Sequence, residues 1–472
     1  MQALAGVLLR SGSVVSGSDR SDSEPLRRLG ARGAAVHVGH RAEQVPEGAD
    51  LVVHSPAVPP SNAELLAARQ RGVEAIGYAE LLGRLMKLRR GVAIAGAHGK
   101  STTTAMVAHV LRQAGRDPTF VVGATAGQLD GCCGVGGGPD FVAEACEYQR
   151  SFLKLYPKVA AVLNVEADHL DYYRDIEEIV SAFTDFVSLV PADGVVVVNA
   201  DDRHAPRTVA TSQATVERYG FETGLDWSAA DLSDDRGRFR FTLLRRGEAV
   251  TRIAMTLAGR HNVSNALAAA AICACCDVGP EALAAGIGSF AGVHRRLTER
   301  GRRGGIVVAD DYAHHPTEIQ ATLKAARAYY QPKRMWVIFQ PHQHSRTRFL
   351  MEDFARSFSA ADVIVIPDIY FVRDSEELRS LVSSADLVAS VRAAGGEARY
   401  VADLAEVAEH VCADWRPGDL VLTMGAGEIW QVADELVARL PTERRKRRQE
   451  RRRSTADAGT QTGAETQRSP ED

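Results

Sequence analysis

Short runs of apolar, often β-branched residues alternate with amphipathic helical stretches along almost the whole chain. This alternation is typical of a parallel sheet whose strands are joined by crossover helices. The sequence therefore predicts an α/β fold, with functional residues at the carboxyl ends of the strands. The predicted strands span residues 50–54, 92–95, 159–164, 195–199, 306–309, 335–339, 363–366 and 420–424.

Interruptions of this pattern divide the chain of 472 residues into domains. One hydrophobic core rarely serves so long a chain, so two or three domains are expected. We predict domains at residues 1–88, 89–293 and 294–440. From Pro441 the apolar periodicity stops, and residues 441–472 carry a basic run followed by polar residues. This composition predicts a disordered, solvated tail, although such a basic run could also touch RNA or an anionic membrane surface.

The composition is that of an ordinary globular protein, with 45% hydrophobic and 25% charged residues and a formal net charge of −4. No apolar run approaches the roughly 18 residues that a membrane-spanning helix needs, and the first ten residues lack the features of an export signal. The charge calls for neither nucleic acid nor an anionic membrane as an obligatory partner. We therefore expect a cytoplasmic protein.

Seven cysteines, an odd number spread over a long chain, favour reduced thiols over a disulfide framework. Cys273, Cys275 and Cys276 include a C-x-x-C spacing, but they lie in an Ala-rich helical run without a second pair of ligands nearby. Small core-facing side chains are a far commoner use of such residues than zinc binding. We predict that these cysteines face the core.

The strongest local motif is Gly-Ala-His-Gly-Lys-Ser, from Gly96 to Ser101, directly after a predicted strand. Glycines let backbone N–H groups approach a phosphate closely, and the amino terminus of the following helix favours an anion. Lys100 would add a point charge, and the Ser101 hydroxyl could hold Mg²⁺. Only two residues separate the glycines, fewer than the four of the usual P-loop pattern. The order of strand, loop and helix nevertheless predicts a nucleotide site.

Two acidic segments follow strands of the same region. Residues 141–148 form an apolar strand that ends in two carboxylates, and the later one, Glu147, would emerge beyond its carboxyl end. Residues 164–171 place His169 among three carboxylates. A hard cation requires such oxygen ligands, although strand-terminal glutamates are often only solvated and a single histidine is most often structural. Together the two segments predict a site for a divalent cation.

Two further groups of polar residues precede predicted helices. Gly259 interrupts the chain before a helix whose first turn carries Asn262 and Asn265. Their amides could contact a purine edge or could merely cap the helix. Residues 308–318 set two acids, a tyrosine and two histidines after a strand, with Pro316 in the first turn of the next helix.

A last polar segment, residues 339–347, follows another predicted strand. It carries Arg346, whose guanidinium can hold an anion through two hydrogen bonds. Each of these groups is a modest signal by itself. Their order along the chain is more informative than any one of them.

Taken in order, the motifs resemble those of the Mur ligases. The motifs are G-x-H-G-K-S-T-T-T, E-A-D-H, G-R-H-N, D-D-Y-x-H-H-P-T-E and Q-P-H-x-x-S-R-T, and the resemblance covers residues 1–440. The set is similar to that of the alanine-adding member of the family. The resemblance implies a Rossmann-like domain for the UDP group, a central P-loop ATPase domain and a second Rossmann-like domain at the carboxyl end.

The resemblance also implies ligands for the motif residues. ATP phosphates would be bound by Gly96, Ala97, His98, Gly99, Lys100, Ser101 and Thr102. Ser101 and Glu147 would hold one Mg²⁺, and Glu147 with His169 a second. Lys100, Glu147 and His169 would be the catalytic residues. The remaining assignments are Asn262 near the adenine, Asp310 or Asp311 near the ribose, and Ser18, Asp19, Ser55, Tyr312, His315 and Arg346 near the nucleotide-sugar or the amino acid.

The implied reaction joins L-alanine to the carboxylate of UDP-N-acetylmuramate at the cost of ATP. A carboxylate resists attack by an amine, so its oxygen would first take the γ-phosphoryl group and give an acyl phosphate, which L-alanine then attacks. Lys100 and the cations would stabilise the transferring charge, and closure of the carboxyl-terminal domain would exclude water. The expected assembly is a monomer or a homodimer.

Three positions depart from the family pattern. The glycine loop and strand that should precede Ala3 are not in the sequence, and we expect that the start was assigned too far downstream. Cys146 stands where an aspartate is common, next to the intact Glu147, so little effect is expected. Gln343 stands where many relatives carry arginine, which makes Arg346 the more secure anion contact.

Three other functions fit parts of the pattern. A recycling ligase that attaches a tripeptide to UDP-N-acetylmuramate would share the nucleotide chemistry. A regulator descended from such a ligase could hold ATP without catalysis, but the combination of Lys100, Ser101, Glu147 and His169 argues against it. A folate-type polyglutamate ligase shares the P-loop, whereas the run from Asp310 to Pro316 favours the nucleotide-sugar enzyme.

Overall fold

The computed structural model describes residues 1–441, which form two compact units. One unit comprises Met1–His294 with Lys324–Tyr329, and the other contains the remaining residues. Of the tail predicted at residues 441–472, all but the first residue lies outside the described part. Within the described part, no helix is long and apolar enough to cross a membrane. The predicted α/β class is confirmed, because parallel strands and helices alternate in both units.

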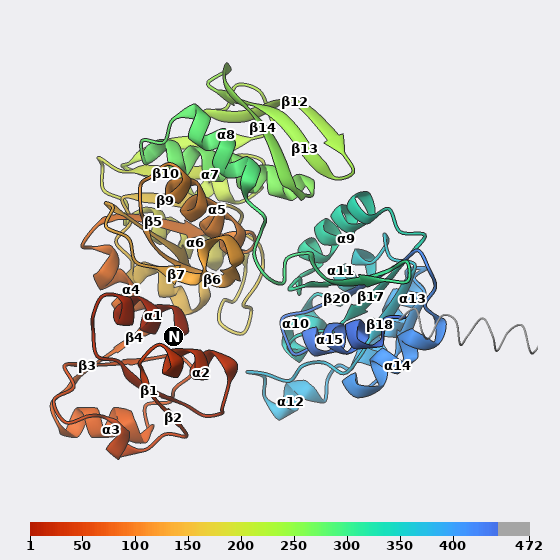
Figure 1. Cartoon of the computed structure of the whole chain (residues 1–472), viewed down its shortest axis with the longest axis horizontal. Helices are drawn as coiled ribbons and strands as arrows, with labels where there is room; N and C mark the ends of the chain where they lie inside the picture. Colours follow the sequence, from red (N-terminus) through yellow and green to blue (C-terminus); the bar gives the residue numbers. More distant parts are fainter. Residues whose placement is uncertain (442–472) are drawn as a thin grey trace, which may run out of the picture. The chain divides into compact units, whose positions relative to one another are not determined.

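The first 86 residues build two separate two-stranded sheets, both parallel. β1 pairs with β2, and β3 pairs with β4. Helices connect the strands in the usual crossover manner (Figure 1). The elements are α1 (Gln2–Arg10), β1 (Ser16–Asp19), α2 (Glu24–Ala31), β2 (Ala35–Val38), β3 (Leu51–His54), α3 (Ala63–Gln70), β4 (Glu74–Gly77) and α4 (Tyr78–Met86).

A ten-stranded sheet organises the middle of the chain, in the order β14-β13-β12-β11-β10-β9-β5-β8-β6-β7. Its strands are β5 (Arg90–Ala95), β6 (Thr119–Ala126), β7 (Gly131–Gly134), β8 (Asp140–Ala145), β9 (Val159–Val162), β10 (Val195–Asn199), β11 (Thr215–Gly220), β12 (Trp227–Asp235), β13 (Arg238–Arg245) and β14 (Glu248–Ala258). The main helices are α5 (Lys100–Gln113), α6 (Ile176–Val187), α7 (Arg260–Cys275) and α8 (Pro280–Ser289). The central strands β11 to β6 pair in parallel, and the edge strand β7 is antiparallel to β6.

An antiparallel meander, β12–β13–β14, extends one edge of this sheet. This meander was not predicted from the sequence, in which only alternating strands and helices were expected. Two-residue turns at Arg236–Gly237 and Arg246–Gly247 join the strands, and all four turn residues have positive φ values between 50° and 84°. Turns of this handedness match the twist of a hairpin. An X-Gly pair between two runs of alternating polarity was the local signal in the sequence.

The second unit contains a six-stranded sheet in the order β15-β16-β20-β17-β18-β19, parallel except for β15. Its strands are β15 (Thr298–Arg303), β16 (Ile306–Asp311), β17 (Arg334–Phe339), β18 (Val363–Ile366), β19 (Ala398–Tyr400) and β20 (Asp419–Met424). Its helices are α9 (Pro316–Tyr330), α10 (His344–Phe349), α11 (Met351–Ser357), α12 (Glu376–Arg379), α13 (Ser384–Ala393), α14 (Leu404–Asp414) and α15 (Trp430–Arg439). All eight strands predicted from the sequence are present.

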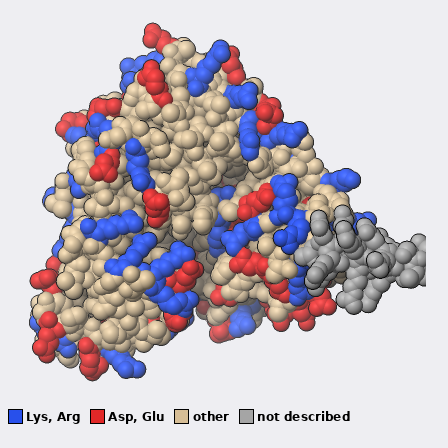
Figure 2. All heavy atoms as spheres, viewed as in Figure 1, with Lys and Arg blue, Asp and Glu red and all other residues tan. Residues whose placement is uncertain are grey.

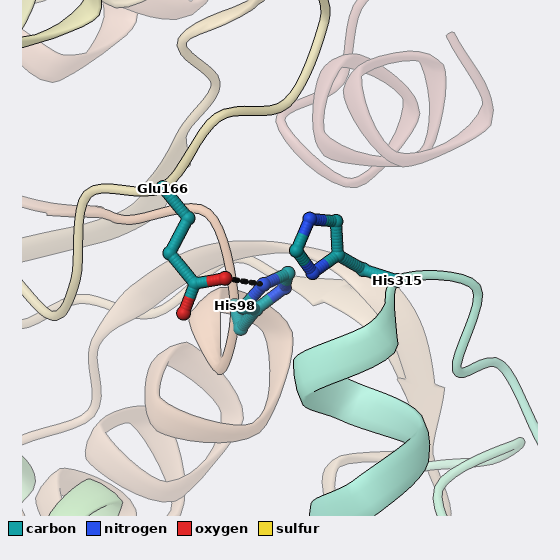
Figure 3. Close-up of side chains that lie close together, drawn as sticks. All are labelled: His98, Glu166 and His315. Atoms are coloured by element: carbon teal, nitrogen blue, oxygen red, sulfur yellow. Dashed lines mark hydrogen bonds and ion pairs between the residues drawn. The ribbon is translucent and has the colours of Figure 1, made fainter. Parts of the chain in front are cut away.

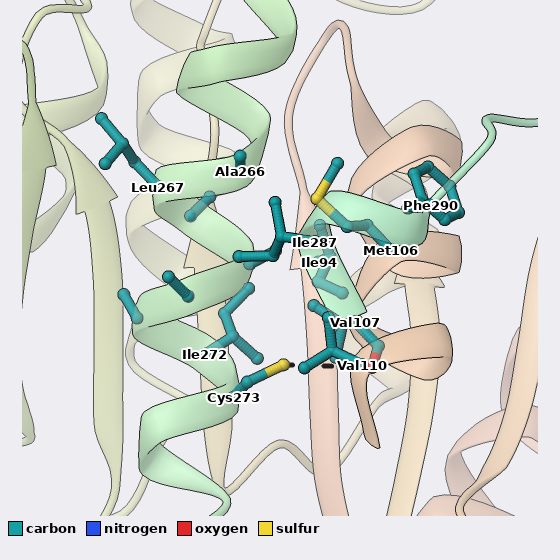
Figure 4. Packing of buried hydrophobic residues seen from close by; sticks show 14 of the residues in the cluster. Ile94, Met106, Val107, Val110, Ala266, Leu267, Ile272, Cys273, Ile287 and Phe290 are labelled. Atoms are coloured by element: carbon teal, nitrogen blue, oxygen red, sulfur yellow. Dashed lines mark hydrogen bonds between the residues drawn. The ribbon is translucent and has the colours of Figure 1, made fainter. Parts of the chain in front are cut away.

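Helices α5, α7 and α8 pack together over one face of the ten-stranded sheet (Figure 4). Alanines fill much of α7, and a Cβ added to Gly286 of α8 would lie 2.9 Å from the Val110 Cα atom of α5. Small residues therefore allow these backbones to approach closely. Cys273 and Cys276 are fully buried in this core, as predicted, and Cys275 packs at its margin.

The other face of the same sheet carries a second core, to which the first 86 residues contribute. Leu4 of α1 and Leu82 of α4 are buried in one cluster with Phe141 of β8 and Phe183 of α6. Burying side chains of this size stabilises the fold by about 1.5–3 kcal/mol each. The amino-terminal segment is therefore anchored on the central sheet through its own apolar side chains.

Candidate active site

The glycine loop lies where it was predicted, between β5 and α5. Gly96 has φ 150° and Gly99, which caps α5, has φ 81°. L-residues with a side chain rarely adopt this backbone conformation. A Cβ at position 99 would also lie 2.6 Å from Oδ1 of Asn265 on α7. Both conformation and space therefore require glycine at the amino terminus of α5.

Asn164, which follows β9, holds this loop in place. Its side-chain oxygen accepts a hydrogen bond of 2.7 Å from the His98 amide, and its side-chain nitrogen donates one of 3.1 Å to the His98 carbonyl. Its backbone carbonyl accepts from the Ala97 amide at 3.2 Å. No role for Asn164 was predicted from the sequence. An amide residue that follows a strand beside the P-loop strand was the available signal.

Lys100 begins α5, and its side chain turns back over the loop. The Nζ atom donates to the backbone carbonyls of Gly96 and Ala97, the latter at 3.1 Å, and to Oε1 of Glu147 at 3.0 Å. Burial is the largest single effect and lowers the pKa of Lys100, but the charge of Glu147, its hydrogen bond and the other acidic groups nearby together raise the pKa above its ordinary value. Lys100 is thus a fixed positive charge beside the first turn of a helix whose dipole favours anions.

Glu147 is the buried centre of the predicted cation site. Only 4% of its surface is exposed, and Oε1 lies 3.7 Å from Nε2 of His169. The other carboxylate oxygen, Oε2, is buried and has no hydrogen-bond partner among the described residues. Tyr173 donates a hydrogen bond of 2.5 Å to the Glu147 carbonyl and so fixes the backbone there. A buried carboxylate oxygen without a donor fits a cation ligand.

His98 extends from the loop towards a second acid. Its Nε2 atom lies 3.3 Å from Oε2 of Glu166, and Figure 3 shows the two side chains facing each other. Glu166 orients the His98 ring, a contact that the sequence analysis did not predict.

Ser101 and Thr102 occupy the first turn of α5, as predicted for phosphate binding. Ser101 is partly accessible and Thr102 is buried. The next two hydroxyls, on Thr103 and Thr104, are buried with no partner among the described residues. Amide and hydroxyl donors therefore concentrate at this helix terminus.

Asn262 makes only local hydrogen bonds. Its side-chain nitrogen donates to the Ala258 carbonyl at 2.7 Å, and its side-chain oxygen accepts from Asn265 at 3.1 Å. No side chain caps the amino terminus of α7, so the capping role considered for Asn262 is not seen, and its contact with adenine stays a prediction. Asn265, in turn, is the residue that crowds Gly99.

In the second unit, Asp310 and Asp311 end β16 and are almost fully buried. Asp310 accepts hydrogen bonds from Arg295 at 3.0 Å and from Thr423 at 2.7 Å. Asp311 accepts from the Leu297 and Ala313 amides at 2.6 and 2.8 Å. Burial raises the pKa of Asp311 to about 6, against the opposing charge of Arg296. Both acids thus tie the chain segment 295–297 to the sheet.

Three other expected substrate residues of this unit lie close to strand ends. The Tyr312 ring packs under the guanidinium groups of Arg295 and Arg296, at 5.0 and 5.4 Å from its centroid. His315 is 5% exposed and directly precedes α9. Arg346, in α10, is 8% exposed and contacts Nδ1 of His342 at 3.2 Å. These side chains are held rigidly rather than free in solvent.

Gln343, the departure noted in the sequence, caps α10 with φ 72°. It is 2% exposed, and its side-chain nitrogen has no partner among the described residues. The neighbouring Asp374 carboxylate accepts hydrogen bonds from the His344 amide and from the Ser345 hydroxyl, the latter at 2.6 Å. Asp374 thus neutralises the amino terminus of α10.

The expected residues of the amino-terminal segment line the ends of β1 and β3. Ser18 donates a hydrogen bond of 2.6 Å to Glu64 and lies 2.8 Å from Nδ1 of His40. Asp19 is exposed and accepts from the Ser21 amide at 3.3 Å. Ser55 accepts from the Ala57 amide at the same distance. Hydroxyl, imidazole and carboxylate groups are therefore available at these strand ends.

Comparisons with known proteins find matches over most of the chain. Three family models match the chain: "Mur ligase family, catalytic domain" at residues 1–90, "Mur ligase middle domain" at 94–273, and "Mur ligase, glutamate ligase domain" at 295–427. A protein of Caldanaerobacter subterraneus subsp. tengcongensis named UDP-N-acetylmuramate--L-alanine ligase is 42% identical over 93% of this chain and 95% of its own length. A protein of the same name from Acetivibrio thermocellus is 40% identical over 92% of each chain.

Solved structures resemble the fold over nearly the whole chain. The UDP-N-acetylmuramate-alanine ligase of Thermotoga maritima has a TM-score of 0.78 and 27% identity, covering 93% of this chain and 96% of that one. A murein peptide ligase from Psychrobacter arcticus has a TM-score of 0.69 at 24% identity, which concerns the fold alone. The predicted three-domain α/β architecture is confirmed, and the chain belongs to the Mur ligase family.

Proposed function

We propose that the chain ligates L-alanine to the carboxylate of UDP-N-acetylmuramate, with ATP converted to ADP and phosphate, as a step of peptidoglycan synthesis. Relatives that carry this name at about 40% identity over more than nine-tenths of the chain support the proposal. The structural observation that carries it is the ion pair of Lys100 and the buried Glu147 beside a glycine loop. A tripeptide-adding activity is not favoured by these relatives.

ATP phosphates would lie against the amides of residues 96–102, with Lys100 as their counter-charge. Asn164 keeps these amides in place, so little reorganisation is needed when the anion binds. Ser101, Glu147 and His169 would hold Mg²⁺, as two ions in the pattern that the family resemblance implies. Mg²⁺ neutralises phosphate charge and draws electron density from the transferring group.

The reaction would begin with attack of the substrate carboxylate on the γ-phosphorus of ATP. The oxygen–phosphorus bond to ADP breaks, and an acyl phosphate forms. The amine of L-alanine then attacks the acyl carbon, and phosphate leaves with the bonding electron pair. Lys100 would stabilise negative charge on the phosphoryl group during transfer, since its raised pKa keeps it protonated at neutral pH.

The remaining assignments are part of the same proposal. Ser18, Asp19 and Ser55 would contact the UDP group, and Tyr312, His315 and Arg346 the sugar or the amino acid. Asn262 and the acids Asp310 and Asp311 have local partners in the structure, so any contact with adenine or ribose would add to a structural role. We propose domains at residues 1–88, 89–293 and 294–440. The reaction would take place in the cytoplasm, where ATP is the phosphoryl donor. The protein would act as a monomer or a homodimer.

Phosphate release from ATP tests the proposal directly. Turnover is expected only when UDP-N-acetylmuramate, Mg²⁺ and L-alanine are all present, and the product should carry the mass of one added alanine. Replacing L-alanine with the tripeptide should abolish turnover. Turnover with the tripeptide but not with L-alanine would refute the alanine assignment, and no substrate-dependent turnover at all would refute the ligase.

A further inference from the structure

Tyr173 connects two residues that were assigned to the cation, Glu147 and His169. It lies in the loop between β9 and α6, which also carries His169, and only 1% of its surface is exposed. Its hydroxyl donates a hydrogen bond of 2.5 Å to the Glu147 carbonyl, and its backbone N–H donates one of 2.9 Å to the His169 carbonyl. One buried residue therefore ties together two segments that follow different strands, β8 and β9.

Both segments have a backbone that needs such support. His169 has φ 55°, and Gln149 and Arg150, shortly after Glu147, have φ 52° and 53°. Residues with a side chain rarely adopt this left-handed conformation, which persists only where neighbouring contacts hold it. The Arg150 amide donates at 2.9 Å to the same Glu147 carbonyl that Tyr173 holds. The hydrogen bonds of Tyr173 thus act on the strained backbone of both segments.

The side chains around these bonds are confined as well. The centroid of the Tyr148 ring lies 4.8 Å from that of the His169 ring. The Tyr173 ring is buried in the same apolar cluster as Phe183 of α6. A tyrosine with its ring in the core and its hydroxyl on the Glu147 carbonyl fixes that carbonyl relative to the core.

We propose that Tyr173 is a positioning residue for the divalent cation, because it sets the separation of the Glu147 and His169 backbones and so of their ligand atoms. The inference rests on the cation site of the proposed function. Oε1 of Glu147 and Nε2 of His169 lie 3.7 Å apart. This separation is less than twice the roughly 2.1 Å of a Mg²⁺–ligand bond, so both atoms can bind one ion.

Tyr173→Phe removes the hydroxyl and keeps the ring in the core. The Glu147 carbonyl keeps the Arg150 amide as a donor, so the variant should fold. Mn²⁺ accepts the same kinds of ligand as Mg²⁺ and is detected by electron paramagnetic resonance. When Mn²⁺ alone is titrated into the full chain, its dissociation constant should be about tenfold higher for the variant than for the parent, as is typical when a contact that orients a metal ligand is lost.

Tyr219→Phe is the matched control for this measurement. Tyr219 is also 1% exposed, and it lies on β11 rather than in the loop that carries His169. Each variant loses one buried hydroxyl, so both should unfold about 2–4 °C below the parent. Only Tyr173→Phe should bind Mn²⁺ more weakly. Equal Mn²⁺ affinities in the two variants would overturn the positioning role.

The nitrogen coupling of bound Mn²⁺ shows whether His169 is a ligand. The electron spin-echo spectrum of the parent should contain a histidine nitrogen coupling that is absent in His169→Gln and weakened in Tyr173→Phe. Surface carboxylates that bind Mn²⁺ do not contribute to this signal, and on the face drawn in Figure 2 acidic side chains lie dispersed among basic ones. A coupling that persists in His169→Gln would overturn the site. A coupling unchanged in Tyr173→Phe would overturn the role of Tyr173.

Kinetics separate this inference from the proposed function. In Tyr173→Phe the Mg²⁺ concentration for half-maximal phosphate release should rise about tenfold, and the rate at saturating Mg²⁺ should return to within about threefold of the parent. A rate that stays low at every Mg²⁺ concentration would indicate a general structural defect and overturn the positioning role. If the parent shows no alanine-dependent turnover while the Mn²⁺ results are as expected, the proposed function fails and the role of Tyr173 at the cation site stands.

Discussion

At the scale of single residues, the candidate site depends on one carboxylate whose two oxygens have different surroundings. Oε1 of Glu147 accepts the Lys100 ammonium, and Oε2 is buried without a partner among the described residues. Deleting one charge of a buried ion pair destabilises a protein much more than deleting one charge of an exposed pair, because the remaining charge is left buried without a partner. Glu147 is therefore expected to be less tolerant of neutral replacement than Glu144, an acid near the end of the preceding strand β8.

Glu147→Gln should reduce alanine-dependent phosphate release by at least about a hundredfold, because the proposed metal ligand and the counter-charge of Lys100 are lost together. The Mg²⁺ concentration that gives half-maximal rate should rise as well. Glu144→Gln is the matched control, since Glu144 accepts a hydrogen bond from the Gly123 amide. Its rate should stay within tenfold of the parent. Equal losses in the two variants would contradict a special role for Glu147.

Asp311 should make folding of the second unit depend on pH. Its pKa in the folded state is about 6, above the value of about 3.9 expected for an unfolded chain. The folded state therefore binds more protons between these values, and stability falls as pH rises from about 4 to about 6. The full cost above pH 6 is about 3 kcal/mol.

Denaturant unfolding of the parent and of Asp311→Asn at several pH values measures this cost. Because the amide does not titrate, the variant should gain about 3 kcal/mol relative to the parent between pH 4 and pH 7. Any constant difference from altered hydrogen bonds to Leu297 and Ala313 cancels in the comparison. A difference that does not change with pH would show that Asp311 keeps an ordinary pKa.

At the scale of elements, helix α5 carries a left-handed glycine at each end. Gly99 precedes it with φ 81°, and Gly115 follows it with φ 72°. The two glycines differ in the room available for a side chain. A Cβ at position 99 would clash with Asn265, whereas one at position 115 would have no neighbour within 4 Å. The same substitution therefore tests backbone strain alone at one end and strain plus a lost phosphate cradle at the other.

Gly115→Ala should lower the free energy of unfolding by about 1 kcal/mol and leave the KM for ATP unchanged. Gly99→Ala should cost more stability and should also raise the KM for ATP by at least about tenfold, because the displaced amides no longer match the phosphates. Steady-state kinetics and thermal unfolding of both variants give the comparison. An unchanged KM in Gly99→Ala would mean that ATP does not bind at this loop.

The sequence allowed a good prediction of those elements whose signal is local. The strand β5, the glycine loop and α5 follow from consecutive residues, and in the structure Lys100 of this segment contacts Glu147. Contacts between distant segments were harder to foresee. Asn164 and Glu166 follow β9, and His98 follows β5. Both residues contact His98 because β5 and β9 are neighbours in the sheet. Neither pairing can be read from spacing alone.

At the scale of the whole molecule, each unit has a core of its own. Leu267 of α7 is fully buried under the ten-stranded sheet, and Leu436 of α15 is fully buried against the six-stranded sheet. Units with separate cores commonly unfold as separate cooperative blocks. The chain should therefore show more than one thermal transition.

Leu267→Ala and Leu436→Ala should each lower a different transition in differential scanning calorimetry. The loss expected for a buried leucine is about 2–5 kcal/mol. The parent scan provides the reference, and the two variants act as controls for each other because they make the same chemical change. A single transition that both variants shift equally would show that the units unfold as one.

The two small sheets of the amino-terminal segment bear on how the protein behaves at high concentration. β1–β2 and β3–β4 each have only two strands, which leaves edges with backbone donors and acceptors that no described strand satisfies. Such edges are templates for strands of other molecules, and two-stranded sheets open readily. Colloidal stability should accordingly be set by this segment rather than by the larger sheets, with light scattering rising first under conditions that loosen it.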